Sequence, residues 1–179
     1  HSLTASIKAM QPVLANGPAM IIASPNIVPP ADSLAFQTSP SDEHITEAIA
    51  QYLKQNKIDK IGMIAATDAS GEVGVVSARK VFGEQNINLQ LARVDLRATD
   101  ATSQIAAVAG TDTKVVYSSY SGAGAATVVK SFVNLDLKQP LIVSYANLSQ
   151  AFIDVVKGFL PYRLLGTGVR ALVPASGSA

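Results

Sequence analysis

The sequence predicts an α/β fold in which helices cover both faces of a mostly parallel sheet, a three-layer αβα arrangement. From residue 39 onwards, short apolar runs alternate with segments of helical periodicity. The apolar runs, such as residues 61–66, are continuous rather than alternating, which is typical of strands that are covered on both faces. Strands and helices that alternate at this spacing form right-handed βαβ units, and such units build a parallel sheet.

The first 38 residues follow a looser pattern than the rest of the chain. Five prolines interrupt any long helix there: Pro12, Pro18, Pro25, Pro29 and Pro30. We expect a short helix over residues 4–14, a short buried strand over residues 19–23, and a loop over residues 25–36.

Regular elements begin at a strong helix start. Ser39 can serve as the N-cap, Pro40 suits the first helical position, and Asp42 lies near the positive end of the helix dipole. Apolar residues at helical spacing carry this first helix to residue 53. We expect further helices over residues 71–82, 99–109, 122–134 and 148–156. We expect strands over residues 61–66, 89–96, 114–118, 141–144 and 169–173.

Composition excludes several classes of function. The 14 basic and 13 acidic side chains leave a formal charge of +1, too little to bind nucleic acid by bulk neutralisation of phosphates. The sequence has no cysteine, so it can form neither a disulfide nor a zinc–thiolate site. Histidine occurs only as His1 and His44, and His44 with Asp42 and Glu43 is too small a cluster for a metal centre. We therefore expect no metal and no cofactor.

The loops that follow the expected strands carry most of the candidate binding groups. In open α/β sheets, ligands bind beyond the carboxyl ends of the strands. These ends lead into residues 66–71, 97–100, 118–122 and 144–147, which are rich in hydroxyls, and Tyr120 and Tyr145 follow strand ends directly. Such an edge can offer hydroxyls, backbone N–H groups and aromatic walls to a polar small molecule. The alternative is that each hydroxyl is only a helix cap or a turn former.

No catalytic constellation can be assembled from this sequence. Residues 122–127 follow a strand and open a helix, as a dinucleotide fingerprint does, but Thr127 stands at the third glycine position and no acid ends the next strand. The G-x-S-x-G pattern of a serine nucleophile is absent. His44 has neither a nucleophile nor an orienting partner in the sequence pattern. We expect that the chain is not an enzyme.

Five motifs, in chain order, resemble the type I solute-binding proteins of ABC importers, in the branched-chain amino-acid (Leu/Ile/Val-binding) group. They correspond to the crossover F-R-T-x-x-x-D, the turn D-x-x-G-x, D-x-t-x-Q-l, L-G-L-K-x-P, and e-G-v-x-x-x-x-P. Here they read FQTSPSD at residues 36–42, ATDASGE at 66–72, DATSQI at 100–105, LDLKQP at 135–140 and GVRALVP at 168–174. In the fourth motif, Asp136 replaces the usual glycine.

The resemblance implies a two-lobe clamshell that closes on its ligand by hinge motion, with a periplasmic-binding-protein-like type I fold. Residues 1–38 resemble a partial first-lobe segment, residues 39–174 nearly all of the second lobe, and residues 175–179 a tail. The resemblance also implies that the opening part of the first lobe, its returning C-terminal part and an export leader are to be expected outside this chain. The family also implies a periplasmic or extracellular location and the importer's membrane subunits as partners. The unpaired first-lobe segment leaves open a homodimer.

Departures from the family pattern bear on the ligand. Amino-acid-binding members usually carry an aromatic residue where this chain has Ser70. They also hold the ligand's ammonium with an acid near the end of the fourth strand, and residues 144–149 contain none. Burying an ammonium without a carboxylate is costly. We therefore expect a small carboxylate without an α-amine, such as an aromatic or short aliphatic acid, with a branched-chain amino acid as the other candidate.

The resemblance places eight residues at the interlobe cleft. Ser24 and Asn26 of the first-lobe segment are candidates to hold a ligand carboxylate. The second lobe contributes Thr67, Ser70, Ser118, Tyr120, Tyr145 and Asn147. Two other functions remain open: a ligand-sensing domain of a receptor or transcriptional regulator with the same fold, and a small-molecule enzyme on a flavodoxin-like or Rossmann-like sheet.

Overall fold

The computed structural model describes residues 4–13, 17–24 and 27–168 of the 179-residue chain. Its N-terminal unit, taken here as the described residues up to 38, contains helix α1 (Thr4–Met10) and strands β1 (Met20–Ile22) and β2 (Ala35–Gln37). The two strands pair in parallel, with Ile21 opposite Phe36. The expected helix and first strand form, but both are shorter than predicted. Strand β2 was not predicted, because its three residues follow a proline-rich stretch.

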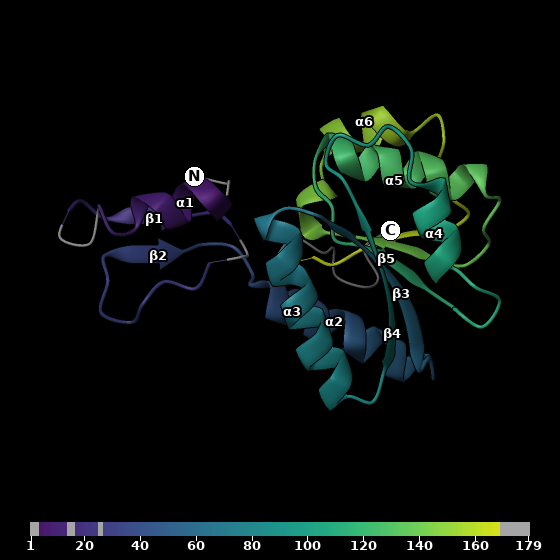
Figure 1. The fold of residues 1–179 in the computed structure, drawn as a ribbon, viewed down its shortest axis with the longest axis horizontal. Coiled ribbons are helices and arrows are strands. Elements are labelled where there is room, and N and C mark those ends of the chain that lie inside the picture. The colour runs from purple at the N-terminus through teal and green to yellow at the C-terminus, as the bar shows by residue number, and fades with distance from the viewer. Residues whose placement is uncertain (1–3, 14–16, 25–26, 169–179) are drawn as a thin grey trace, which may run out of the picture.

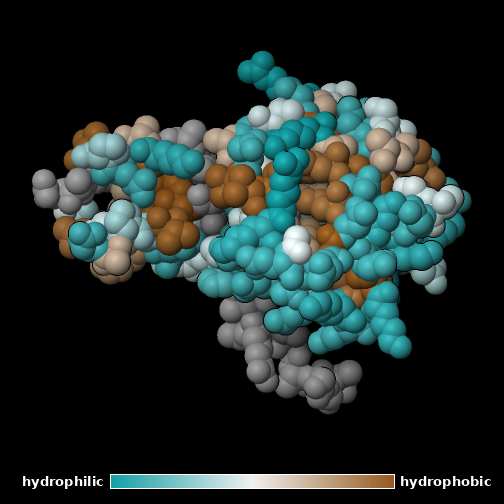
Figure 2. Space-filling view, turned by 60° about the horizontal axis from the view of Figure 1, so that its bottom comes forward, coloured by the Kyte–Doolittle hydropathy of each residue, from teal (hydrophilic) through white to brown (hydrophobic). Residues whose placement is uncertain are grey.

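Helix α1 covers only one face of this two-stranded sheet. Ile7 of α1 packs against Ile22 and Ile27 on that face. On the other face, Ile21 is 65% exposed and Phe36 is 56% exposed. Figure 2 shows hydrophobic surface gathered on the N-terminal unit. The unit therefore has one packed face and one open apolar face.

The first long helix, α2 (Asp42–Gln55), begins two residues later than a Ser39 cap would place it. Its N-cap is Ser41, whose Oγ accepts a hydrogen bond of 3.2 Å from the His44 N–H. The prediction of Ser39 as the cap was therefore wrong. The Ser39 hydroxyl is instead buried, with no hydrogen-bond partner among the described residues.

The main sheet confirms the predicted fold class. It contains β3 (Lys60–Ala66), β4 (Asn88–Val94), β5 (Val116–Ser118), β6 (Leu141–Val143) and β7 (Leu164–Gly166), in the order β4-β3-β5-β6-β7, and every neighbouring pair is parallel. Strand β7 was not predicted. The strand expected over residues 169–173 lies outside the described residues.

Helices cover the main sheet on both sides (Figure 1). Helix α3 (Ala69–Glu84) packs beside α2 on one face, against side chains that include Met63 and Ala65. Helices α4 (Thr102–Val108), α5 (Ala123–Asn134) and α6 (Gln150–Val156) cover the other face, which presents Ile64 and Ala66. Successive residues of β3 thus point into opposite cores, which explains why its sequence is apolar from Ile61 onwards.

One departure from the family pattern has a backbone explanation. Asp136, at the usual glycine position of the fourth motif, has φ +52°. This is the left-handed region, which glycine adopts without steric cost and aspartate tolerates better than most residues. The chain therefore keeps the turn although it lacks the glycine.

Two classes of feature are absent from the described residues. No helix among them is long and apolar enough to cross a bilayer. The same residues contain no group of three or more His, Asp or Glu side chains that could hold a metal ion. The division of the chain into a first-lobe segment and a second lobe stays a prediction.

Candidate functional site

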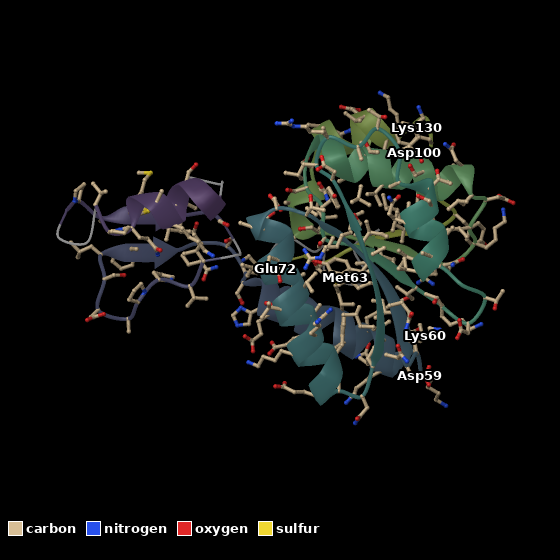
Figure 3. The ribbon with its side chains drawn as sticks, viewed as in Figure 1. Asp59, Lys60, Met63, Glu72, Asp100 and Lys130 are labelled. Atoms are coloured by element: carbon tan, nitrogen blue, oxygen red, sulfur yellow. The ribbon has the colours of Figure 1, made fainter. Side chains whose placement is uncertain are left out.

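The candidate site lies at the carboxyl edge of the main sheet. Because its strands are parallel, the loops after β3, β5 and β6 all emerge at this edge. Figure 3 shows Asp59 and Lys60 at the far end of the sheet and Glu72 on the side that faces the N-terminal unit. Helix α1 contacts α3 on this side. The loops that carry the predicted binding residues therefore face the N-terminal unit.

The turn between β3 and α3 is held by its own polar groups. Asp68 is the N-cap of α3, and its Oδ1 accepts hydrogen bonds from the Gly71 N–H at 2.9 Å and the Ser70 Oγ at 2.7 Å. A Cβ added at Gly71 would lie 2.0 Å from the carbonyl oxygen of Ala66, so this position requires glycine. Thr67 is exposed and Ser70 is half-buried. The turn thus presents two hydroxyls on a fixed backbone.

Three of the predicted residues lie beneath the edge and not on its surface. Tyr120 is 2% exposed and donates its hydroxyl to the carbonyl of Val94. Asn147 is 1% exposed and donates its side-chain amide to the carbonyl of Tyr120 at 2.8 Å. The Ser118 hydroxyl is buried, with no hydrogen-bond partner among the described residues. Their part in ligand binding stays a prediction.

Burial changes the acid–base behaviour of Tyr120. It raises the pKa of the phenol to about 12, and the negative charges of Asp68 and Asp95 add to the effect. The phenol therefore stays protonated at neutral pH, as its donation to the Val94 carbonyl requires. Tyr120 acts as a neutral hydrogen-bond donor in this position.

Tyr145 lines a small pocket at the other end of the edge. It is half-buried in the short 3₁₀ helix η1 (Tyr145–Asn147) that follows β6. The pocket has a volume of about 140 Å³, and the N-terminal part of α2 and the residues after β7 complete it: Pro40, His44, Ile45, Ala48, Thr167 and Gly168. The Thr167 hydroxyl is buried without a partner among the described residues. Sequence reasoning missed Thr167, because it follows a strand that was not predicted.

The two candidates from the N-terminal unit have different outcomes. Ser24 is 1% exposed, and its carbonyl accepts a hydrogen bond of 3.3 Å from the Gln37 side chain. This bond joins the end of β1 to the end of β2. Asn26 lies outside the described residues.

Sequence reasoning also missed a basic residue at the edge. Arg93 stands one residue before the end of β4, where the register places it opposite Ala65. Its guanidinium donates to the carbonyl of Ala66 at 3.2 Å and to Glu72 at 2.6 Å. The signal was present in the sequence, since Arg93 is a charged residue inside the strand predicted over residues 89–96, but the pairing of β3 with β4 was needed to interpret it.

Comparisons with known proteins agree with this architecture. No curated protein sequence matches the chain. A solved branched-chain amino acid ABC transporter protein from Thermus thermophilus, with bound valine, is 18% identical with a TM-score of 0.77 over 88% of this chain and 43% of its own. A solute-binding protein from R. palustris, in complex with benzoate, is 19% identical with a TM-score of 0.70 over 86% and 44%.

A third similar structure is that of a protein from a fatty acid transporter. The fatty acid ABC transporter substrate-binding protein from Thermomonospora curvata is 16% identical, with a TM-score of 0.69 over 83% of this chain and 39% of its own. At these identities the likeness establishes the fold alone. The chain spans less than half of the length of each of these three proteins.

The family itself rests on a sequence match. Residues 2–160 match the family described as periplasmic binding protein. The match covers more than half of the chain, and it confirms the family that the five motifs predicted. The family consists of non-catalytic solute-binding proteins, as the absence of a catalytic constellation led us to expect. The chain belongs to the periplasmic binding protein family.

Proposed function

We propose that this chain is part of the extracytoplasmic solute-binding component of an ABC importer. The observation that carries the proposal is the carboxyl edge of the main sheet, whose polar turns face the N-terminal unit in a periplasmic-binding-protein fold. The protein would capture its solute without catalysis in the periplasm or at the extracellular surface and deliver it to the importer's membrane subunits. A homodimer through the open face of the N-terminal unit stays a prediction.

We assign the predicted residues to two roles at this edge. Thr67, Ser70 and Tyr145 are exposed or half-buried, so their side chains can touch a solute. Ser118, Tyr120 and Asn147 are buried, and they form the support beneath the edge. On the opposite side, Ser24 is equally buried and would act as support, while Asn26 remains the predicted residue that would hold the solute's carboxylate.

The solute we propose is a small carboxylate without an α-amine, such as an aromatic or short aliphatic acid. The similar structures include both a valine and a benzoate complex, so this choice rests on the residues of the site. Of the carboxylates in the turn after β3, Glu72 is paired with the Arg93 cation, and Asp68 is held by the hydrogen bonds with which it caps α3. Residues 144–149 contain no acid. An ammonium buried beside the end of β6 would therefore have no carboxylate in that loop, and burying it there without a counter-charge is costly.

Native mass spectrometry of the gently purified chain, followed by denaturation and identification of any released molecule, tests the proposal. We expect a small organic acid to be released. Calorimetric titration with benzoate and with leucine then tests the ligand class directly. Tight binding of leucine with no response to benzoate would contradict the carboxylate assignment, while binding of neither would contradict the function proposed for this chain.

A further inference from the structure

One side chain joins the two ends of the turn that carries Thr67 and Ser70. Arg93 Nη1 donates to the carbonyl of Ala66, the last residue of β3, and Arg93 Nη2 donates to Glu72 Oε2 in the first turn of α3. The distances are 3.2 Å and 2.6 Å. Residues 67–71 are thus bracketed by a single guanidinium.

The backbone fixes where this guanidinium can lie. Strand β4 pairs with β3 in parallel, with Arg93 opposite Ala65 and Val94 opposite Ala66. In the next step of the same register, the Thr67 N–H donates to the Val94 carbonyl at 3.1 Å. The planar guanidinium has five donors in a rigid fork, so it can serve two acceptors at once, which a lysine ammonium does less well.

The ion pair between Arg93 and Glu72 is suited to a local role. The Arg93 side chain is 30% exposed and the Glu72 side chain is 63% exposed. An ion pair with this exposure contributes little to global stability, because water screens it. Its effect is on the turn that it spans, where it restricts the movement of α3's first turn relative to the end of β3.

We propose that Arg93 is a positioning residue of the solute site: it holds the turn of residues 67–71 in the conformation that presents Thr67 and Ser70. The inference rests on the proposed function, because it assigns the purpose of the turn to solute binding. Arg93 itself need not touch the solute. By pairing with Glu72, Arg93 also neutralises one carboxylate at the edge, which favours an anionic solute over a cationic one.

Hydrogen exchange of individual amides measures whether Arg93 holds the turn. The informative amides are those of Thr67, Gly71 and Glu72, which donate to Val94 O, Asp68 Oδ1 and Asp68 O. In Arg93→Gln we expect these amides to exchange about three- to tenfold faster, since the free energy of local opening falls with the loss of a charge-assisted hydrogen bond. Arg93→Lys, which keeps the charge but not the fork, should lie between Arg93→Gln and the wild type.

The matched control is an ion pair of the same length elsewhere on α3. Lys80 Nζ lies 2.6 Å from Glu43 Oε1, and it joins α3 to α2 at a position eight residues after Glu72 along α3. Lys80→Gln should leave the exchange of the three amides at the wild-type rate. Circular dichroism of all variants shows that each remains folded.

Titration with benzoate provides the second measurement. We expect Arg93→Gln to bind benzoate about three- to tenfold more weakly than the wild type, because a loosened turn must be ordered on binding. The double variant Arg93→Gln with Glu72→Gln removes the freed carboxylate but not the loosening, so it should recover only part of the affinity. Lys80→Gln should bind as the wild type does.

The two measurements separate this inference from the proposed function. Exchange at the three amides equal to that of Lys80→Gln would overturn the role of Arg93, whatever the chain binds. Faster exchange with unchanged benzoate affinity would also overturn it, since the turn would then not serve the solute. A wild-type chain that binds neither benzoate nor leucine would contradict the proposed function, while the exchange comparison would still decide whether Arg93 holds the turn.

Discussion

The side-chain amide of Asn147 donates a hydrogen bond of 2.8 Å to the backbone carbonyl of Tyr120, and both residues are buried. The bond joins the loop after β6 to the loop after β5, two segments 27 residues apart in the sequence. Tyr120 in turn donates its hydroxyl to the carbonyl of Val94 at the end of β4. Three strand ends are therefore linked by two side chains.

Asn147→Ala should destabilise the fold through this link. The Tyr120 carbonyl would remain buried without a partner, which costs about 1–3 kcal/mol of unfolding free energy. Urea unfolding followed by circular dichroism measures the loss. Asn134→Ala, at an exposed position at the end of α5, is the control and should unfold close to the wild type. Equal stability of the two variants would show that the Asn147 bond contributes nothing.

Two glycines of α3 should respond in opposite ways to alanine. At Gly71 the new Cβ would lie 2.0 Å from the Ala66 carbonyl oxygen, so the start of the helix must shift, at a cost of about 1–3 kcal/mol. At Gly83 nothing lies within 4 Å, and alanine should stabilise the helix by about 0.5 kcal/mol. Thermal unfolding of both variants checks the signs, and destabilisation by Gly83→Ala would contradict the argument.

Stability should fall at strongly alkaline pH because of Tyr120. Its folded-state pKa is raised to about 12 by burial, whereas a tyrosine in the unfolded chain titrates near 10. The folded state thus holds the proton more tightly, so this contribution to stability is present below pH 10 and is lost as the pH rises towards 12. Burial raises the pKa of Tyr117 in the same direction.

Urea unfolding at a series of pH values between 8 and 12 measures this dependence. Tyr120→Phe should lose part of the slope and retain the part that Tyr117 contributes. A slope that is identical in Tyr120→Phe and the wild type would mean that the Tyr120 phenol is not protected from solvent.

Tyr145 and Tyr162 form a matched pair for solute binding. Tyr145 is half-buried at the carboxyl edge, whereas Tyr162 precedes β7 at the opposite edge and is 83% exposed. Tyr145→Ala should weaken benzoate binding about three- to tenfold, which corresponds to an aromatic contact of about 1 kcal/mol. Tyr162→Ala should leave the affinity unchanged in the same calorimetric titration. An equal effect of the two substitutions would place the solute elsewhere.

The open face of the N-terminal unit should promote self-association. Ile21 and Phe36 lie side by side on it, and apolar surface of this kind favours contact with a second copy. Light scattering after gel filtration should show a mass that rises with concentration, and Phe36→Ser should reduce that rise. Val155→Ser, at a position on α6 that is 59% exposed, is the control. A wild type that is monomeric at all concentrations would contradict the prediction.

The sequence predicted every strand of the described fold except β2 and β7. Strand β3 is easily predicted because residues 61–66 are buried on both faces of the sheet, which makes this run apolar. Strands β2 and β7 have three residues each, as β5 and β6 do, but unlike those two they are not buried throughout and so form no fully buried apolar run. The N-cap moved from Ser39 to Ser41 because two serines flank Pro40, and only the backbone geometry selects between them.

The candidate site was predictable in its location but not in its depth. Parallel strands bring their carboxyl ends to one edge, so Thr67, Ser70 and Tyr145 could be placed there from the strand pattern alone. The buried position of Tyr120 could not be predicted in this way, because it depends on the packing of the Tyr120 ring against α5. A Cβ at Gly124 would lie 2.6 Å from the Tyr120 ring, so a small residue on the helix makes room for the aromatic one.

The strand order of the main sheet has a consequence for how specificity can change. The chain leaves β3 towards β4 through α3 on one face, then crosses β3 through α4 on the other face to reach β5. The connections after β3 and β5 therefore diverge to opposite sides, and this point of reversal is where doubly wound sheets receive ligands. The strand order creates the opening, and the loops line it. Exchanging residues 67–70 should thus redirect solute preference while the sheet that supports them stays intact.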